Sequence, residues 1–96
     1  MTGYKPQTTF YTDFSIADRF GIGAIKDTFK RAFEGWKHNV VYLTELVMVL
    51  NWKMWDHHER NKKLALVYKE LWETADAWAC ENLQGDDLKY FYRTTD

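Results

Sequence analysis

The chain has 96 residues, of which 46% are hydrophobic, 28% charged and 18% aromatic. That length fits one hydrophobic core, and the composition is that of a globular domain rather than of a disordered or membrane-embedded chain. The formal net charge of −1 argues against a strongly basic nucleic-acid binder and against a heavily acidic mimic of DNA.

The first 37 residues predict an arm followed by two helices. Residues 1–14 lack helical periodicity and contain a run of threonine and aromatic residues, so we expect an extended aromatic N-terminal arm that packs through Phe10 and Phe14. Residues 15–37 predict a short helix, with Ser15 as its N-cap, and then a first long helix from Gly23. That long helix has an apolar stripe at helical spacing, formed by Ile22, Ile25, Phe29, Ala32, Phe33 and Trp36.

The remaining sequence predicts two long helices and a short one. The central helix spans 39–59 and has a wide apolar arc, the third spans 62–83, and a short C-terminal helix spans 86–92. The polar break at 60–63 is short enough for a tight helix–helix connection. We therefore predict one all-α domain over 1–96, with a three-helix core built on an antiparallel helical hairpin and short terminal helices.

The apolar and aromatic residues leave the oligomeric state open. The arc on the central helix includes Trp52 and Trp55, and Trp72 flanks the core stripe of the third helix. If other elements do not cover these indoles, they form a contact surface for a protein partner or for a second copy of the chain. A homodimer is therefore one expectation.

The cysteine content and the N-terminus indicate a reducing compartment. Cys80 is the only cysteine, so no internal disulfide forms, and the acids near it argue against an activated thiol. The N-terminus has no signal-like apolar run, and the unbroken apolar run 46–50 is too short to cross a bilayer. We expect a cytoplasmic protein that is not bound to a membrane.

Carboxylates provide the one enzymatic alternative. Asp56 and Glu59 on the central helix, with Glu70 and Glu73 on the third, resemble the paired acidic segments that bind magnesium in all-α nucleotide pyrophosphohydrolases. In a hairpin that turns near Asn61, Asp56 would lie opposite the region near Leu66, well before Glu70 on the third helix. Glu70 and Glu73 also face away from the inner stripe of that helix. The other reading of 56–59 is a solvated helix end with His58 turned toward the core. We therefore favour a protein that is not an enzyme and has no metal or cofactor.

Charge is unevenly distributed and predicts two alternative binding surfaces. The leading one is acidic and would occlude a basic groove of a protein partner, with charge aiding the encounter. The alternative is a nucleic-acid-binding or regulatory module that uses the basic flank of the first long helix. The acidic surface comprises Glu70, Glu73, Glu81, Trp72, Asp86 and Asp87, and the basic flank comprises Lys26, Lys30, Arg31 and Lys37.

Three segments, 12–18, 24–28 and 42–53, resemble small proteins carried by prophages and mobile elements of Firmicutes. This resemblance implies an accessory protein that acts in a bacterial cytoplasm. Small phage proteins of this size often bind and block a host defence complex, such as a CRISPR nucleoprotein nuclease. A phage-encoded inhibitor that acts by steric occlusion is the function implied by the resemblance, and it identifies no functional residue.

Overall fold

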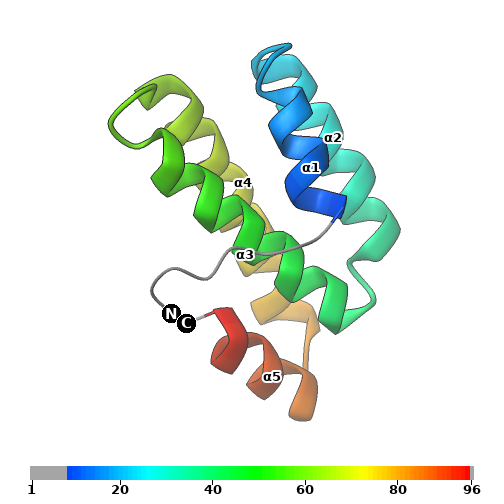
Figure 1. Ribbon diagram of the computed structural model, residues 1–96. Coiled ribbons are helices and arrows are strands. Elements are labelled where there is room, and N and C mark those ends of the chain that lie inside the picture. Colours follow the sequence, from blue (N-terminus) through cyan, green and yellow to red (C-terminus); the bar gives the residue numbers. More distant parts are fainter. Residues whose placement is uncertain (1–8, 96) are drawn as a thin grey trace.

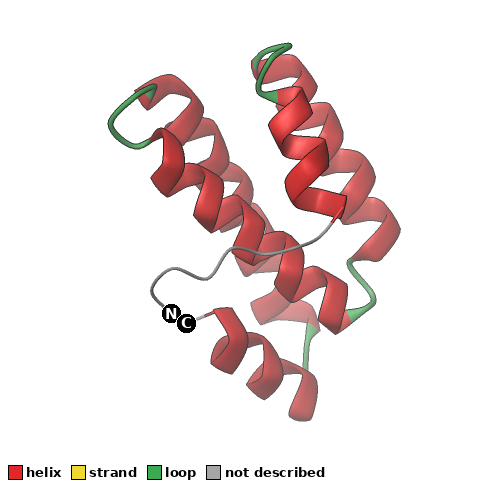
Figure 2. Ribbon diagram, in the orientation of Figure 1, coloured by secondary structure: helices red, strands yellow, loops and turns green. Residues whose placement is uncertain are grey.

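The computed structural model describes residues 9–95, and these form five α-helices with no strand among them (Figures 1 and 2). The prediction of an all-helical fold is confirmed for this part of the chain. The helices are α1 (Thr9–Ala17), α2 (Ile22–Trp36), α3 (Val40–His57), α4 (Lys62–Asn82) and α5 (Asp86–Thr95).

Polar and glycine residues set the starts of the three long helices. Asn39 caps α3, where its side-chain oxygen accepts from the backbone N–H groups of Val41 and Tyr42 at 3.1 and 3.4 Å. Asn61 caps α4 in the same way, accepting from the N–H of Leu64 at 3.2 Å. Gly21 precedes α2 with φ = 111°, a conformation that side chains disfavour, so this glycine allows the sharp turn between α1 and α2.

Helix α3 is the centre of the molecule. It packs along α4, contacts α5 near its own N-terminal half, and is flanked on another side by the paired helices α1 and α2 (Figure 1). Because neighbours surround it, one side of its apolar arc is buried, whereas Val41 and Trp55 on the other side are 46% and 61% exposed. Its fully buried residues are Leu43, Thr44, Leu46, Val47, Val49 and Leu50.

The prediction of an extended arm is wrong for residues 9–14, which form the first turns of α1. The reason is a helical spacing within a segment rich in β-formers: Phe10, Phe14 and Ala17 fall at i, i+4 and i+7, and all three are buried. Tertiary burial of this stripe outweighs the local preference of the threonine and aromatic run for extended backbone. Ser15 consequently lies inside α1 rather than capping a later helix. Residues 1–8 of the predicted arm lie outside the described residues.

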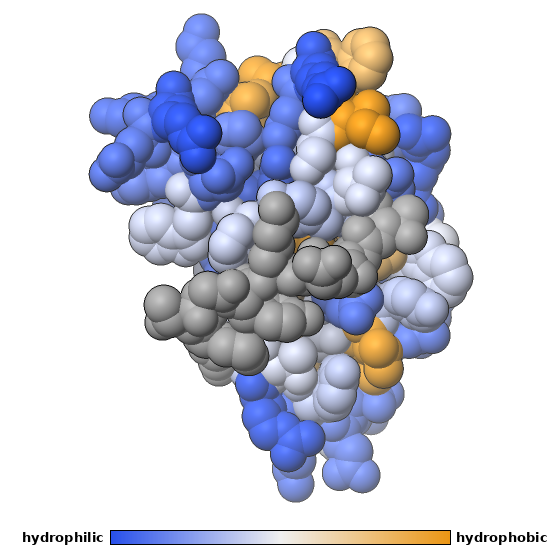
Figure 3. Space-filling model, viewed as in Figure 1, coloured by the Kyte–Doolittle hydropathy of each residue, from blue (hydrophilic) through white to orange (hydrophobic). Residues whose placement is uncertain are grey.

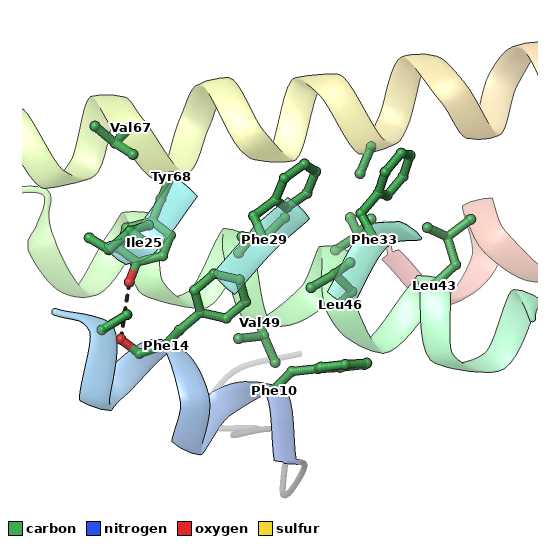
Figure 4. Close-up of a cluster of buried hydrophobic side chains, with 14 of the residues drawn as sticks. Phe10, Phe14, Ile25, Phe29, Phe33, Leu43, Leu46, Val49, Val67 and Tyr68 are labelled. Atoms are coloured by element: carbon green, nitrogen blue, oxygen red, sulfur yellow. Dashed lines mark hydrogen bonds between the residues drawn. The ribbon is translucent and has the colours of Figure 1, made fainter. Parts of the chain in front are cut away.

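The buried cluster is also larger than the three-helix core that we expected. It draws on all five helices, since α1 contributes two phenylalanines and α5 contributes the fully buried Phe91. In Figure 4 the ring of Phe14 projects from α1 toward the buried side chains of the other helices, and Tyr68 extends toward it from α4. The two rings lie edge to face with centroids 5.7 Å apart. The last helix runs to Thr95 rather than to residue 92.

Phe14 is the change that most directly tests the helical docking of α1. Phe14→Ala removes a side chain with no solvent exposure, and we expect it to lower the free energy of unfolding by about 3–5 kcal/mol. Phe20→Ala, at a phenylalanine that is 78% exposed, should change it by no more than about 0.5 kcal/mol. Urea unfolding followed by circular dichroism measures both values. Equal midpoints for the two variants would contradict the packing of α1 into the core.

Candidate protein-docking groove

A groove of about 670 Å³ runs between α1 and α2 and reaches the first turns of α3. It is open to solvent, and most of its lining is apolar. Since three separate helices contribute to it, the groove exists only when α1 is packed in place. The lining residues are Phe10, Asp13, Ile16, Ala17, Phe20, Ala24, Asp27, Thr28, Arg31, Ala32, Trp36, Tyr42 and Glu45.

Small side chains on α2 form one long side of the groove. Ala24, Thr28 and Ala32 are four residues apart, so they lie along one face of the helix. Each is followed by a large buried residue, Ile25, Phe29 or Phe33, which is rotated about 100° toward the core. Helix α2 therefore has two neighbouring faces: one with large residues that pack in the core, and one with small residues that lines the groove.

Large apolar side chains stand at both ends of the groove and remain exposed. Ile16 and Phe20, from α1 and the turn that follows it, are 50% and 78% exposed. Trp36 and Tyr42 are 44% and 41% exposed, with ring centroids 4.4 Å apart. Figure 3 shows hydrophobic residues gathered over the end of the molecule where α1 and α2 meet. Exposed apolar side chains that gather at one concavity are typical of a binding surface.

The rim of the groove carries more negative than positive charge. Arg31 forms an ion pair with Asp27 on the same helix, with Nη2 and Oδ2 3.7 Å apart. Asp13 on α1 and Glu45 on α3 also line the groove, and neither forms an ion pair with another described residue. Three acids and one base therefore leave an excess of two negative charges on the rim.

The chain matches no family model, no curated protein and no solved structure.

A buried polar cluster holds the C-terminal end of α1 against α3 and α4. Asp18 follows α1 directly, and its Oδ2 atom lies 2.6 Å from Nζ of Lys53 and 3.0 Å from Nε2 of His57. The hydroxyl of Tyr68 donates to the other carboxylate oxygen at 2.5 Å. Lys53 is only 3% exposed, and its ammonium also lies 3.4 Å from the Ser15 hydroxyl. One carboxylate therefore joins three helices.

The surroundings of Asp18 determine its ionisation. Burial raises the pKa of this carboxyl, but hydrogen bonds from Lys53, Tyr68 and His57 lower it by more, so the pKa lies below the ordinary value of 3.8. Burial and the hydrogen bond to Asp18 raise the pKa of the Tyr68 phenol far above 10.0. The ionised carboxylate contributes stability that is present above pH 3.8 and is lost as the pH falls through the lower folded pKa.

This cluster anchors the C-terminal end of α1 to α3 and α4. None of Asp18, Lys53, His57 and Tyr68 lines the groove, and the rings of His57 and Tyr68 stack on each other at an angle of 8°. Both oxygens of the Asp18 carboxylate already contact donors, which are Lys53, His57 and Tyr68. The consequence for the groove is indirect, because fixing Asp18 fixes the adjoining turn and with it the position of Phe20.

The residues of the predicted acidic surface lie on α4 and at the start of α5. Their carboxylates are exposed, whereas the indole of Trp72 is half-buried and packs against the core. Much of the Trp72 indole therefore packs inside the domain and is not free to contact a partner. None of the five acids lines the groove. The exposed members are Glu70, Glu73, Glu81, Asp86 and Asp87.

The predicted basic flank is partly engaged in internal contacts. Lys26 and Lys30 are exposed on α2, but Arg31 pairs with Asp27 at the groove rim. Lys37 lies over the rings of Phe33 and Trp78, with Nζ 5.5 and 5.8 Å from their centroids, and it contacts Glu34. Two of the four cations therefore have partners within the molecule.

The carboxylates of the enzymatic alternative do not converge. In residues 9–95, no three His, Cys, Asp or Glu side chains come close enough together to hold a metal ion. Asp56 instead accepts a hydrogen bond from Arg60 at 3.1 Å. The histidine that turns toward the core is His57 and not His58, because only position 57 faces Asp18.

Other side chains singled out from the sequence lie outside the groove. Trp55 is 61% exposed near the end of α3, while Trp52 is half-buried. Cys80 is a free, exposed thiol whose sulfur lies 2.6 Å from the Tyr92 hydroxyl oxygen. None of the described helices combines the length and the apolar character needed to cross a bilayer.

Breaking the anchor should destabilise the domain strongly. Lys53→Met leaves the largely buried Asp18 carboxylate, whose side chain is 15% exposed, without its ammonium partner, and we expect a loss of about 3 kcal/mol in the free energy of unfolding at pH 7. Adding Asp18→Asn should restore part of that loss, because no buried charge then remains uncompensated. Lys69→Met, at an exposed lysine of α4, is the matched control and should change stability by less than about 0.5 kcal/mol. Urea unfolding that gives the same stability for Lys53→Met and Lys69→Met would show that the ion pair does not hold α1.

Proposed function

We propose that this protein is a non-catalytic protein-binding module, and that the groove between α1 and α2 receives an apolar segment of its partner. The observation that supports this is the placement of Ile16, Phe20, Trp36 and Tyr42, four exposed apolar side chains, around one concavity. A domain of this size has few large side chains to spare from its core. Leaving four of them in water at one place is unfavourable for the isolated chain and favourable for a complex.

A partner in the groove would remove the exposed surface of these apolar side chains from water. Complete burial of a large apolar side chain contributes about 1.5–3 kcal/mol, and tryptophan and tyrosine are enriched among the residues that dominate binding energy. Phe20 and Trp36, at opposite ends of the groove, are therefore the anchors of the proposed interface. Their combined contribution has to exceed the loss of translational and rotational freedom on association, so a shallow contact at one end is insufficient.

In this proposal α3 and α4 form the predicted hairpin scaffold, and the pair α1 and α2 presents the groove. Binding acts by occupation: a partner segment held here is unavailable for its own function, and the rest of the domain blocks approach to that part of the partner. This agrees with the steric inhibition implied by the resemblance to prophage proteins. A bacterial defence complex remains the expected partner on that resemblance alone.

The acidic surface on α4 and α5 is retained as a second, separate prediction. It would steer a basic partner at long range, whereas the groove would supply the apolar contact. The two surfaces use different residues, so variants can separate them. A nucleic-acid-binding function is not proposed, because Arg31 and Lys37 are already paired within the molecule.

Paired surface variants test the proposal. We expect a double variant, Phe20→Ser with Trp36→Ala, to weaken binding to the protein captured by wild type from a bacterial lysate by at least about a hundredfold, which corresponds to about 2.7 kcal/mol. The matched control is Trp55→Ala with Leu66→Ser, which removes two apolar side chains outside the groove that are 61% and 60% exposed. Affinities are measured by calorimetry with the purified partner.

The outcomes separate the two predicted surfaces. Loss of binding in the groove variant, with binding retained in the control, supports the groove. If the groove variant binds as wild type does while Glu70→Lys with Glu73→Lys abolishes binding, the acidic surface is the interface and the groove proposal fails. Circular dichroism of each variant confirms that the helices are intact.

A further inference from the structure

We propose that the occupant of the groove is an amphipathic α-helix of about three turns that places a lysine or arginine beside Asp13 and Glu45. This inference rests on the proposed function, that the groove binds a partner segment, and it specifies the chemistry of that segment. Three features of the groove support it: the lack of free backbone hydrogen-bonding groups along its helical walls, its length, and the net negative charge of its rim.

The backbone of the groove favours a helical partner. All three walls are helices, whose interior N–H and C=O groups are already bonded to each other, and the described residues contain no strand edge. An extended segment lying against the apolar lining would lose water from its own backbone groups without gaining partners, which costs free energy for each unsatisfied group. A helix satisfies its own backbone and presents only side chains, as in known helix-in-groove complexes.

The length of the groove sets the length of the helix. Ala24 and Trp36 both line it and are twelve residues apart on α2, which corresponds to roughly 18 Å at 1.5 Å per residue. A partner helix of about twelve residues spans that distance with apolar side chains at i, i+3 or i+4, and i+7. The small side chains of Ala24, Thr28 and Ala32 leave room for these anchors, and Phe20 and Trp36 close the two ends.

The rim charge determines the polar face of the helix. Asp27 is neutralised by Arg31 on α2, whereas Asp13 and Glu45, on α1 and α3, form no ion pair with described residues. An acidic or neutral partner would bring these carboxylates toward an apolar contact without compensation, which is unfavourable. A lysine or arginine that flanks the apolar anchors compensates them, and arginine in addition donates two hydrogen bonds to one carboxylate.

Selection from a displayed library of random 16-residue peptides tests this inference without knowledge of the natural partner. We expect the enriched peptides to share apolar residues at helical spacing with an adjacent lysine or arginine, and to become helical by circular dichroism on binding. Phe20→Ser with Trp36→Ala should weaken their binding at least about tenfold. Asp13→Asn with Glu45→Gln, which keeps the shape of both side chains, should weaken it about threefold or more and reduce its salt dependence. Charge reversal to lysine at both positions should then select peptides with acidic residues in place of basic ones.

The other outcomes distinguish a wrong partner segment from a wrong binding surface. Peptides that need Phe20 and Trp36 but are proline-rich, extended or without a basic residue overturn this inference and leave the protein-binding groove in place. Peptides whose binding is insensitive to the groove variant, or a library that yields no binder, overturn the proposed function as well. Asp13→Asn with Glu45→Gln alters only charge. Equal affinity for basic peptides before and after that change would show that Asp13 and Glu45 do not select a basic residue in the partner helix.

Discussion

The structure depends on one buried ion pair, between Lys53 on α3 and Asp18 at the end of α1. A lysine ammonium with 3% exposure cannot remain charged inside an apolar core unless a carboxylate accompanies it, because the loss of hydration costs several kcal/mol. Asp18 satisfies that requirement only when α1 lies against α3 with its C-terminal end near His57 and Tyr68. The ion pair thereby selects one docked position of α1 out of those that simple burial of Phe10 and Phe14 would permit.

The docked position of α1 has a consequence on its opposite side. The helix buries Phe14 toward α3 and α4, and the residues on its other face, with those of the turn that follows, meet the small-residue face of α2 across a groove. Phe20 stays in water because Asp18, two residues earlier, is held by the cluster and Gly21 turns the chain immediately afterwards. The ion pair that holds α1 against the core thus also leaves apolar side chains of the groove exposed to solvent. A partner helix would cover them with little rearrangement, since the walls are packed in advance, and preformed walls lower the entropic cost of binding.

The sequence predicts the long helices well because each carries its own signals. Helical periodicity and the capping residues Asn39 and Asn61 lie within the segments that they govern, and α2, α3 and α4 occupy the regions where helices were expected. The N-terminal helix was missed because its composition favours extended backbone, and only contacts with distant residues reverse that preference. The spacing of Phe10, Phe14 and Ala17 was a usable signal that the threonine-rich context obscured.

The site was harder to predict than the fold, for a physical reason. The groove joins residues from three helices, and the anchor joins Asp18 to partners 35, 39 and 50 residues away in the chain. No local pattern encodes such pairings. Charge counts along the sequence instead drew attention to the acids of α4 and α5, which are exposed but lie away from the groove. An aspartate just before a glycine turn and a lysine within an otherwise apolar helix were the only sequence signs of the anchor, and each is common in solvated positions as well.

Hydrogen exchange of the complex with its natural partner, measured by mass spectrometry, shows whether the partner covers the groove between α1 and α2. We expect binding to slow amide exchange in residues 10–36 and in the first two turns of α3, and to leave exchange in residues 70–87 unchanged. Slowed exchange confined to residues 70–87, with the α1 and α2 segments exchanging as in the free protein, would contradict this expectation.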